Sequence, residues 1–205
     1  MEINKKSTSK ALFKNTGIIA IGQISTKIVN FFLLPLYTAL LTTEEYGLVD
    51  LLITYAGLIA VIVGLQVFQA VFRFLVTIRE NKKECATAIS SIVLFTLLIL
   101  VVYTAIFVPI SKFITVKYAW FLLVYVVSNI LLQTFSSIVR GLGDNTQYAF
   151  ANFFSSAIIV VLNVFFIAIL RLNIGWMLLS YCIGPVLGAV YLILKCKLWN
   201  YISFS

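Results

Sequence analysis

The segment from residue 86 to 110 reads ATAISSIVLFTLLILVVYTAIFVPI and contains no charged side chain. An α-helix rises about 1.5 Å per residue, so an apolar run of this length crosses a hydrocarbon core of roughly 30 Å. Comparable apolar segments cover residues 15–41, 47–72, 118–139, 147–170 and 174–194. The sequence therefore predicts an all-α integral membrane protein, a bundle of six transmembrane helices.

The overall composition supports this fold class and limits where function can reside. The chain is 62% hydrophobic and 11% charged, with a mean hydropathy of +1.08. Soluble domains do not reach these values. The longest connection, residues 73–85, is too short to hold a soluble domain. We expect a basic tail over residues 1–14, a helical lobe over 15–194 that carries the function, and the start of a linker over 195–205.

The net charge of +8 is explained by topology rather than by nucleic acid, because Lys and Arg collect in loops on the cytoplasmic side. Alternate connections hold eleven basic residues: Lys5, Lys6, Lys10, Lys14, Arg73, Arg79, Lys82, Lys83, Arg140, Lys195 and Lys197. The opposite connections hold three: Lys112, Lys117 and Arg171. Both termini are therefore expected on the cytoplasmic side, and no nucleic-acid partner is expected.

The first apolar segment carries a lysine, Lys27, with Gln23 and Asn30 on the same helical face. A charge at the centre of a membrane helix costs roughly 2.5–3.5 kcal/mol on insertion scales, so such residues face a protein interior or a watery cavity. We interpret Lys27 as a cavity residue. The alternative is a buried structural partner such as a glutamine or a carbonyl.

Three further segments also carry polar residues on one helical face, at Gln66, Gln69, Arg73, Asn129, Gln133, Arg140 and Asn152. Any one of these could simply hydrogen-bond a neighbouring helix. Arg73 could also snorkel to the cytoplasmic boundary, and Arg140 could form a salt bridge or a cap with the turn that contains Asp144. Together, the aligned faces favour one hydrophilic surface.

The two remaining segments, 86–110 and 174–194, lack such a face and are expected to pack outside the polar surface. Gly184 and Gly188 have the small-xxx-small spacing at which membrane helices approach closely.

Most catalytic chemistry is missing from the sequence. It contains no histidine, and none of its seven acidic residues lies deep in the membrane by the expected spans. Clustered carboxylates or histidine pairs that would hold a metal are absent, as are a nucleophile elbow and a phosphate-binding loop. We therefore expect no enzyme activity, no metal and no cofactor.

A series of short motifs resembles the polysaccharide-biosynthesis membrane proteins. They are Asn15-Thr16, Pro35-Leu36-Tyr37, Thr43-Glu44-Glu45-Tyr46-Gly47-Leu48, Gln66, Ala70, Arg73-Phe74, Arg140-Gly141-Leu142-Gly143, Tyr148-Ala149 and Asn163. The resemblance covers about residues 15–194 and is to the oligosaccharide (Wzx-type) flippases of the superfamily that includes the MATE multidrug exporters.

That resemblance implies two six-helix lobes facing each other across a central cleft, of which this chain corresponds to one. It implies that a polyprenyl-pyrophosphate-linked oligosaccharide is flipped across a bacterial or archaeal cytoplasmic membrane by alternating access, coupled to an ion gradient. The expected partners are that glycan lipid, the bilayer, glycan-assembly membrane proteins, and a second lobe or further copies of the chain. The family usually has twelve to fourteen helices, so we expect a truncated or half-length form.

In this family context Lys27 would face the pyrophosphate, and Arg73 and Arg140 would form the cytoplasmic mouth that captures the anion. The amides of the polar faces would contact sugar hydroxyls. Two alternatives remain open. One is another exporter of the superfamily, for drugs or for other lipids. The other is a non-transporting scaffold of a glycan-assembly complex, in which the polar faces serve only helix association.

Overall fold

The computed structural model describes Gly17, Phe31 and residues 34–113 and 117–201. Within these residues the regular secondary structure is entirely helical. The long helices are α2 (Thr43–Val63), α3 (Val67–Ile78), α4 (Lys82–Ser111), α5 (Ala119–Gly141), α6 (Asn145–Asn163) and α7 (Ile174–Lys195). A π-helical turn η1 (Val164–Ile169) extends α6, and a short 3-10 helix η2 (Leu198–Tyr201) follows α7.

Five of the described helices are long and apolar enough to cross a membrane: Thr43–Val63, Lys82–Ser111, Ala119–Gly141, Asn145–Ile169 and Ile174–Lys195. This confirms the prediction of an all-α, multi-pass membrane protein. The expected first segment, 15–41, falls mostly outside the described residues, although 34–40 are helical. The six-helix lobe thus stays a prediction.

Four helices begin at a polar residue that satisfies free amides of the first turn. Thr42 and Glu45 form a reciprocal capping box at α2, with Glu45 N donating to Thr42 Oγ1 at 3.2 Å and Thr42 N donating to Glu45 Oε2 at 3.1 Å. Asn81, Asp144 and Asn173 accept from first-turn amides of α4, α6 and α7.

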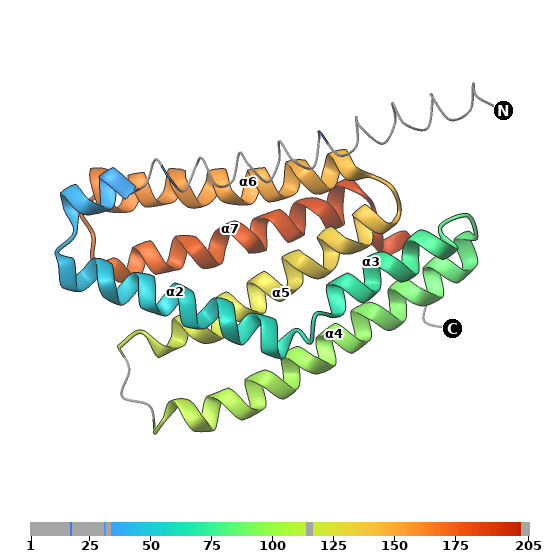
Figure 1. Ribbon diagram of the computed structural model, residues 1–205, viewed down its shortest axis with the longest axis horizontal. Helices are drawn as coiled ribbons and strands as arrows, with labels where there is room; N and C mark the ends of the chain where they lie inside the picture. Colours follow the sequence, from blue (N-terminus) through green and yellow to red (C-terminus); the bar gives the residue numbers. More distant parts are fainter. Residues whose placement is uncertain (1–16, 18–30, 32–33, 114–116, 202–205) are drawn as a thin grey trace.

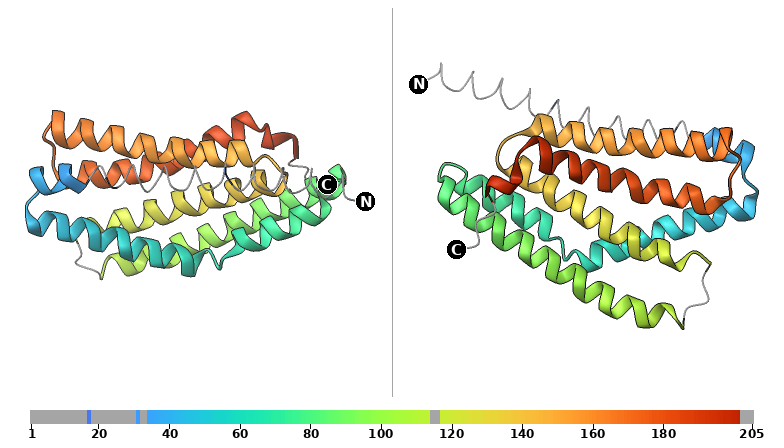
Figure 2. Two further views of the ribbon diagram at one scale, coloured as in Figure 1. Left: turned by 45° about the horizontal axis from the view of Figure 1, so that its top comes forward. Right: turned by 180° about the vertical axis from the view of Figure 1, so that it is seen from behind.

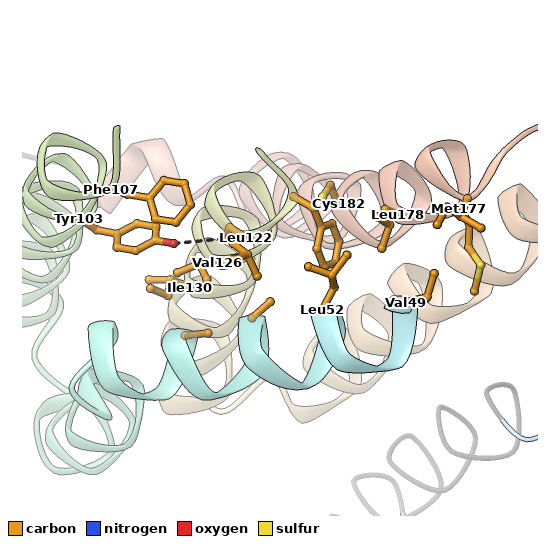
Figure 3. Packing of buried hydrophobic residues seen from close by; sticks show 14 of the residues in the cluster. Val49, Leu52, Tyr103, Phe107, Leu122, Val126, Ile130, Met177, Leu178 and Cys182 are labelled. Carbon is orange, nitrogen blue, oxygen red and sulfur yellow. Dashed lines mark hydrogen bonds between the residues drawn. The ribbon is translucent and has the colours of Figure 1, made fainter. Parts of the chain in front are cut away.

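Helix α5 lies in the middle of the bundle and contacts α2, α3, α4, α6 and α7 (Figures 1 and 2). One core cluster gathers around its first half. Figure 3 shows Leu52 of α2 and Cys182 of α7 directed into this cluster with Val126 of α5. Tyr103 of α4 donates its hydroxyl to the Leu122 carbonyl at 3.2 Å, which ties α4 to α5.

The segment 174–194, which is expected to pack outside the polar surface, forms one of the most buried helices of the bundle. Helix α7 packs between α5 and α6 (Figure 1), and with α5 it is one of the two most buried candidate spans. Its glycines explain the position. A Cβ on Gly184 would lie 2.5 Å from Ile159 Cγ1, and one on Gly188 would lie 3.0 Å from Leu132 Cδ1. The small-residue spacing therefore brings α7 into the centre of the bundle.

The segment expected as one helix over 47–72 is broken. Helix α2 ends at Val63, α3 begins at Val67, and both Leu65 and Gln66 have left-handed backbone with φ of 47° and 54°. Left-handed backbone costs a non-glycine residue roughly 1–2 kcal/mol, so the surrounding structure must hold it in place. The Gln69 side-chain amide supports the turn by donating to Gln66 Oε1 at 2.9 Å.

Replacing Gly184 with Ala should destabilise the bundle, because the added methyl group collides with the Ile159 side chain and the Ser155 carbonyl oxygen. Overpacking of this kind costs roughly 1–3 kcal/mol. The measurement is the unfolding temperature of the purified protein in detergent. Gly57→Ala is the matched control, because no described atom outside its own stretch of helix lies within 4 Å of the added methyl group. Equal unfolding temperatures for the two variants would contradict the proposed packing of α6 against α7.

Candidate functional site

A cavity of about 630 Å³ opens between α3, α5 and α6. Its lining consists of aromatic rings, amides, hydroxyls and one cation: Phe68, Gln69, Phe72, Gln133, Ser136, Ser137, Arg140, Tyr148 and Asn152. The volume falls within the range of small-molecule binding sites. We refer to it below as the arginine cavity.

Helix α5 supplies the polar floor of this cavity. Ser136, Ser137 and Arg140 lie three, four and seven residues after Gln133, so the four side chains project from one face of the helix. This face continues the polar stripe that the sequence predicts.

The guanidinium group of Arg140 is held between two aromatic rings. Its Cζ atom lies 4.3 Å from the ring centroid of Phe72 on α3 and 5.3 Å from that of Tyr148 on α6. Each cation–π contact stabilises by roughly 0.5–2 kcal/mol. Its buried Nε has no hydrogen-bond partner among the described residues. The two aromatic rings thus hold the guanidinium group in place, and its N–H donors remain available to a ligand.

The backbone around Arg140 explains this placement. Helix α5 ends in a Schellman motif, in which Gly143 N donates to Arg140 O at 3.0 Å and Asp144 N donates to Val139 O at 3.1 Å. Gly143 takes the left-handed conformation, with φ of 98°. One residue after Arg140, a Cβ on Gly141 would lie 2.7 Å from Leu75 Cβ. That close approach brings α3, and with it Phe72, against the arginine.

The amide of Asn152 is fixed by two hydrogen bonds. Its Nδ2 donates to Tyr148 O at 2.8 Å and to Ser136 Oγ at 3.3 Å, the second bond joining α6 to α5. Both bonds use the donor end, which leaves Oδ1 as an oriented acceptor. The cavity therefore offers a fixed cation together with amide and hydroxyl groups.

The structure brings four of the sequence-predicted site residues to the arginine cavity: Gln69, Gln133, Arg140 and Asn152. Gln66 lies outside the lining but accepts a hydrogen bond from Gln69. Asn129 donates to the Tyr125 carbonyl one helical turn earlier, and Arg73 is exposed on α3 away from the lining. Lys27, Gln23 and Asn30 lie outside the described residues.

Sequence reasoning missed the aromatic part of the site. Phe68, Phe72 and Tyr148 look like ordinary apolar residues of a membrane helix until the fold places them beside Arg140. A partial signal exists, because Phe68 and Phe72 are four residues apart, share a helical face and flank Gln69.

The lining residues carry one formal charge, which is positive, and include no carboxylate, thiol or imidazole. The hydroxyl groups of the lining are those of Ser136, Ser137 and Tyr148. Among the described residues no group of three or more potential metal ligands occurs. The electrostatics of the site favour an anion that also carries hydroxyl or amide groups.

Comparison with known proteins agrees with the fold. No curated protein and no solved structure matched the chain. One protein family, described as polysaccharide biosynthesis protein, matches residues 12–204, which is nearly the whole sequence. Together with the apolar helices, this match fits a flippase-type membrane transporter at the level of the family. The chain therefore belongs to the polysaccharide biosynthesis protein family.

Proposed function

We propose that the protein translocates a polyprenyl-pyrophosphate-linked oligosaccharide across the cytoplasmic membrane, and that the arginine cavity forms part of the cargo path. The observation that carries this proposal is Arg140, a cation whose Nε has no hydrogen-bond partner among the described residues, in a cavity lined by amides and hydroxyls.

The chemistry of such a cargo matches the cavity group by group. A guanidinium group binds phosphate oxygens through paired, charge-assisted hydrogen bonds. The amides of Gln69, Gln133 and Asn152 can donate to and accept from sugar hydroxyls. The aromatic rings give apolar surface for the CH faces of a sugar, and the polyprenyl chain stays in the lipid.

The distribution of Lys and Arg among the loops predicts how the site is oriented in the membrane. By this rule the chain termini, and the end of α5 that carries Arg140, lie on the cytoplasmic side. A lipid-linked glycan assembled in the cytoplasm would then meet the arginine cavity first. Arg73, exposed on the same helix as Phe72, would attract the pyrophosphate toward the entrance. Lys27, Gln23 and Asn30 would continue the path at membrane depth.

Alternating access would then release the glycan on the outer side, as one lobe of a two-lobed transporter moves against the other. A half-buried cation and neutral amides favour an anionic cargo over the cationic drugs of other exporters in the superfamily.

The hydrogen bond between Asn152 and Ser136 favours a second candidate, a non-transporting scaffold. In that case the polar stripes would serve helix association, a role that interhelical hydrogen bonds commonly have in membranes. A measurable difference separates the scaffold from the transporter. Water should reach the polar helical faces in a transporter and should not reach them in a scaffold.

Replacing Arg140 with Gln should lower surface glycan in cells that depend on this protein by roughly tenfold or more, because a charged hydrogen bond to phosphate is lost. The matched control is Arg171→Gln, which removes an exposed arginine outside the cavity lining. The readout is surface glycan per unit of protein in the membrane. Normal glycan levels in the Arg140 variant would contradict the proposed role.

Water should reach the arginine cavity in a transporter, so cysteines introduced at Gln69 or Gln133 should react with a membrane-impermeant thiol reagent. Leu98→Cys, on the exposed apolar face of α4, is the lipid-facing control and should stay unlabelled. Labelling no faster than at Leu98 would favour the scaffold.

The native cysteines should give little background in this experiment. Cys85 and Cys182 are buried. Burial raises the pKa of the Cys196 thiol, and the negative charge of Asp144 raises it further. The reactive thiolate of Cys196 is therefore scarce at neutral pH, and its labelling should increase as the pH rises.

A further inference from the structure

A groove with a volume of about 570 Å³ opens between α3 and α4, beside the turn that joins them (Figure 1). Its apolar lining comes from Phe74 and Ile78 on α3 and from Ala88 and Ile92 on α4. Phe74 follows Phe72 by two residues, which is roughly 200° around an α-helix. The groove therefore lies on the side of α3 that faces away from the arginine cavity, and the two share no lining residue. We call it the hairpin groove.

The polar lining of the hairpin groove carries one charge of each sign. It consists of four side chains of α4: Lys83, Glu84, Thr87 and Ser91. Thr87 Oγ1 donates to Lys83 O at 3.2 Å and Ser91 Oγ donates to Thr87 O at 3.0 Å, so both hydroxyls offer a ligand only acceptor lone pairs. Asn81 Nδ2 donates to Glu84 Oε1 at 2.7 Å, which orients the carboxylate and leaves its second oxygen to accept a further bond. The groove thus presents one cationic donor beside several acceptors.

The same face of α4 continues beyond the groove as an exposed apolar stripe. Phe95, Leu98 and Val102 lie four, seven and eleven residues after Ser91, so they project from one side of the helix, and all three are exposed. From Ile92 to Val102 the helix rises about 15 Å, which is half of a hydrocarbon core of roughly 30 Å. The charged end of the site therefore lies at the membrane boundary, and the apolar stripe reaches the depth of one leaflet.

This arrangement has the form of a membrane phospholipid, with a headgroup at the boundary and acyl chains along the stripe. The two charges select among headgroups. An anionic headgroup such as phosphatidylglycerol would be attracted by Lys83 but repelled by Glu84. The quaternary ammonium of phosphatidylcholine has no N–H to donate to the carboxylate and the hydroxyls. A primary ammonium has three such donors and forms charge-assisted hydrogen bonds with a carboxylate.

From these features we propose that the hairpin groove binds phosphatidylethanolamine, a zwitterionic phospholipid with a primary amine. Lys83 binds its phosphate, and Glu84 accepts from its ammonium. The bound lipid joins α3 to α4, because the headgroup contacts α4 while the upper acyl chains pack against Phe74 and Ile78. This site lies beyond the proposed transport function and does not depend on it.

The test is the unfolding temperature of the purified full chain in detergent micelles that contain dioleoyl phosphatidylethanolamine, phosphatidylcholine or phosphatidylglycerol at equal mole fraction. The unmodified protein should unfold several degrees higher with phosphatidylethanolamine than with phosphatidylcholine, because a lipid that binds only the folded state stabilises it. Lys83→Gln and Glu84→Gln should each abolish that difference. Lys82→Gln and Glu80→Gln are the matched controls. They remove the same charges from exposed residues outside the groove lining and should keep the difference.

Each difference is taken between two lipids on the same variant, so a change in the stability of the variant itself cancels. The Glu84→Gln side chain also retains an oxygen that can accept from Asn81. The proposal is overturned if phosphatidylcholine or phosphatidylglycerol raises the unfolding temperature as much as phosphatidylethanolamine, as an unselective lipid-facing surface predicts. It is also overturned if Lys83→Gln or Glu84→Gln keeps the full difference. Arg140→Gln should keep it, since Arg140 does not line the groove, so a failure of the lipid site can be distinguished from a failure of the glycan site.

Discussion

Hydrocarbon offers no hydrogen-bond partner to a peptide group or a polar side chain, and the arrangement of this protein follows from that constraint. It makes each candidate span a helix whose backbone bonds close within the segment. It also requires that irregular backbone be covered by protein or line a cavity. The α2–α3 break meets this requirement, because it lies against α4 and α5 around a small cavity. The same constraint applies to polar side chains. Those of Arg140, Gln133 and Asn152 line the cavity between α3, α5 and α6.

Helix α5 connects these features. Its central position lets one polar face serve both cavities, with Gln133 on the small cavity and the arginine cavity, and Arg140 at the end of the stripe. Packing of small residues makes this possible. Gly184 and Gly188 draw α7 against α5 and α6, and Gly141 draws α3 against the end of α5. The rings that hold the guanidinium group come from these packed neighbours, so the geometry of the site depends on the packing of the bundle.

Much of this could be predicted from the sequence because the bilayer imposes simple patterns. Segment length and apolarity predict the spans, and helical periodicity predicts the polar face of α5. The break at Leu65 and Gln66 could not be predicted, because local preference opposes left-handed backbone at both residues. The glycines of α7 predict close packing without naming the partner helices, which are α5 and α6. Phe72 and Tyr148 resemble lipid-facing residues until the fold sets them beside Arg140.

The proposal that the arginine cavity receives the pyrophosphate-linked glycan can be tested by site-specific photo-crosslinking in cells. A photoreactive amino acid is placed at Gln133 in the cavity or at Leu98 on the exposed face of α4. The protein should crosslink to radiolabelled glycan lipid from Gln133 and only to bulk phospholipid from Leu98. Equal crosslinking of glycan lipid from both positions, or none from Gln133 while the protein remains folded, would contradict the proposal.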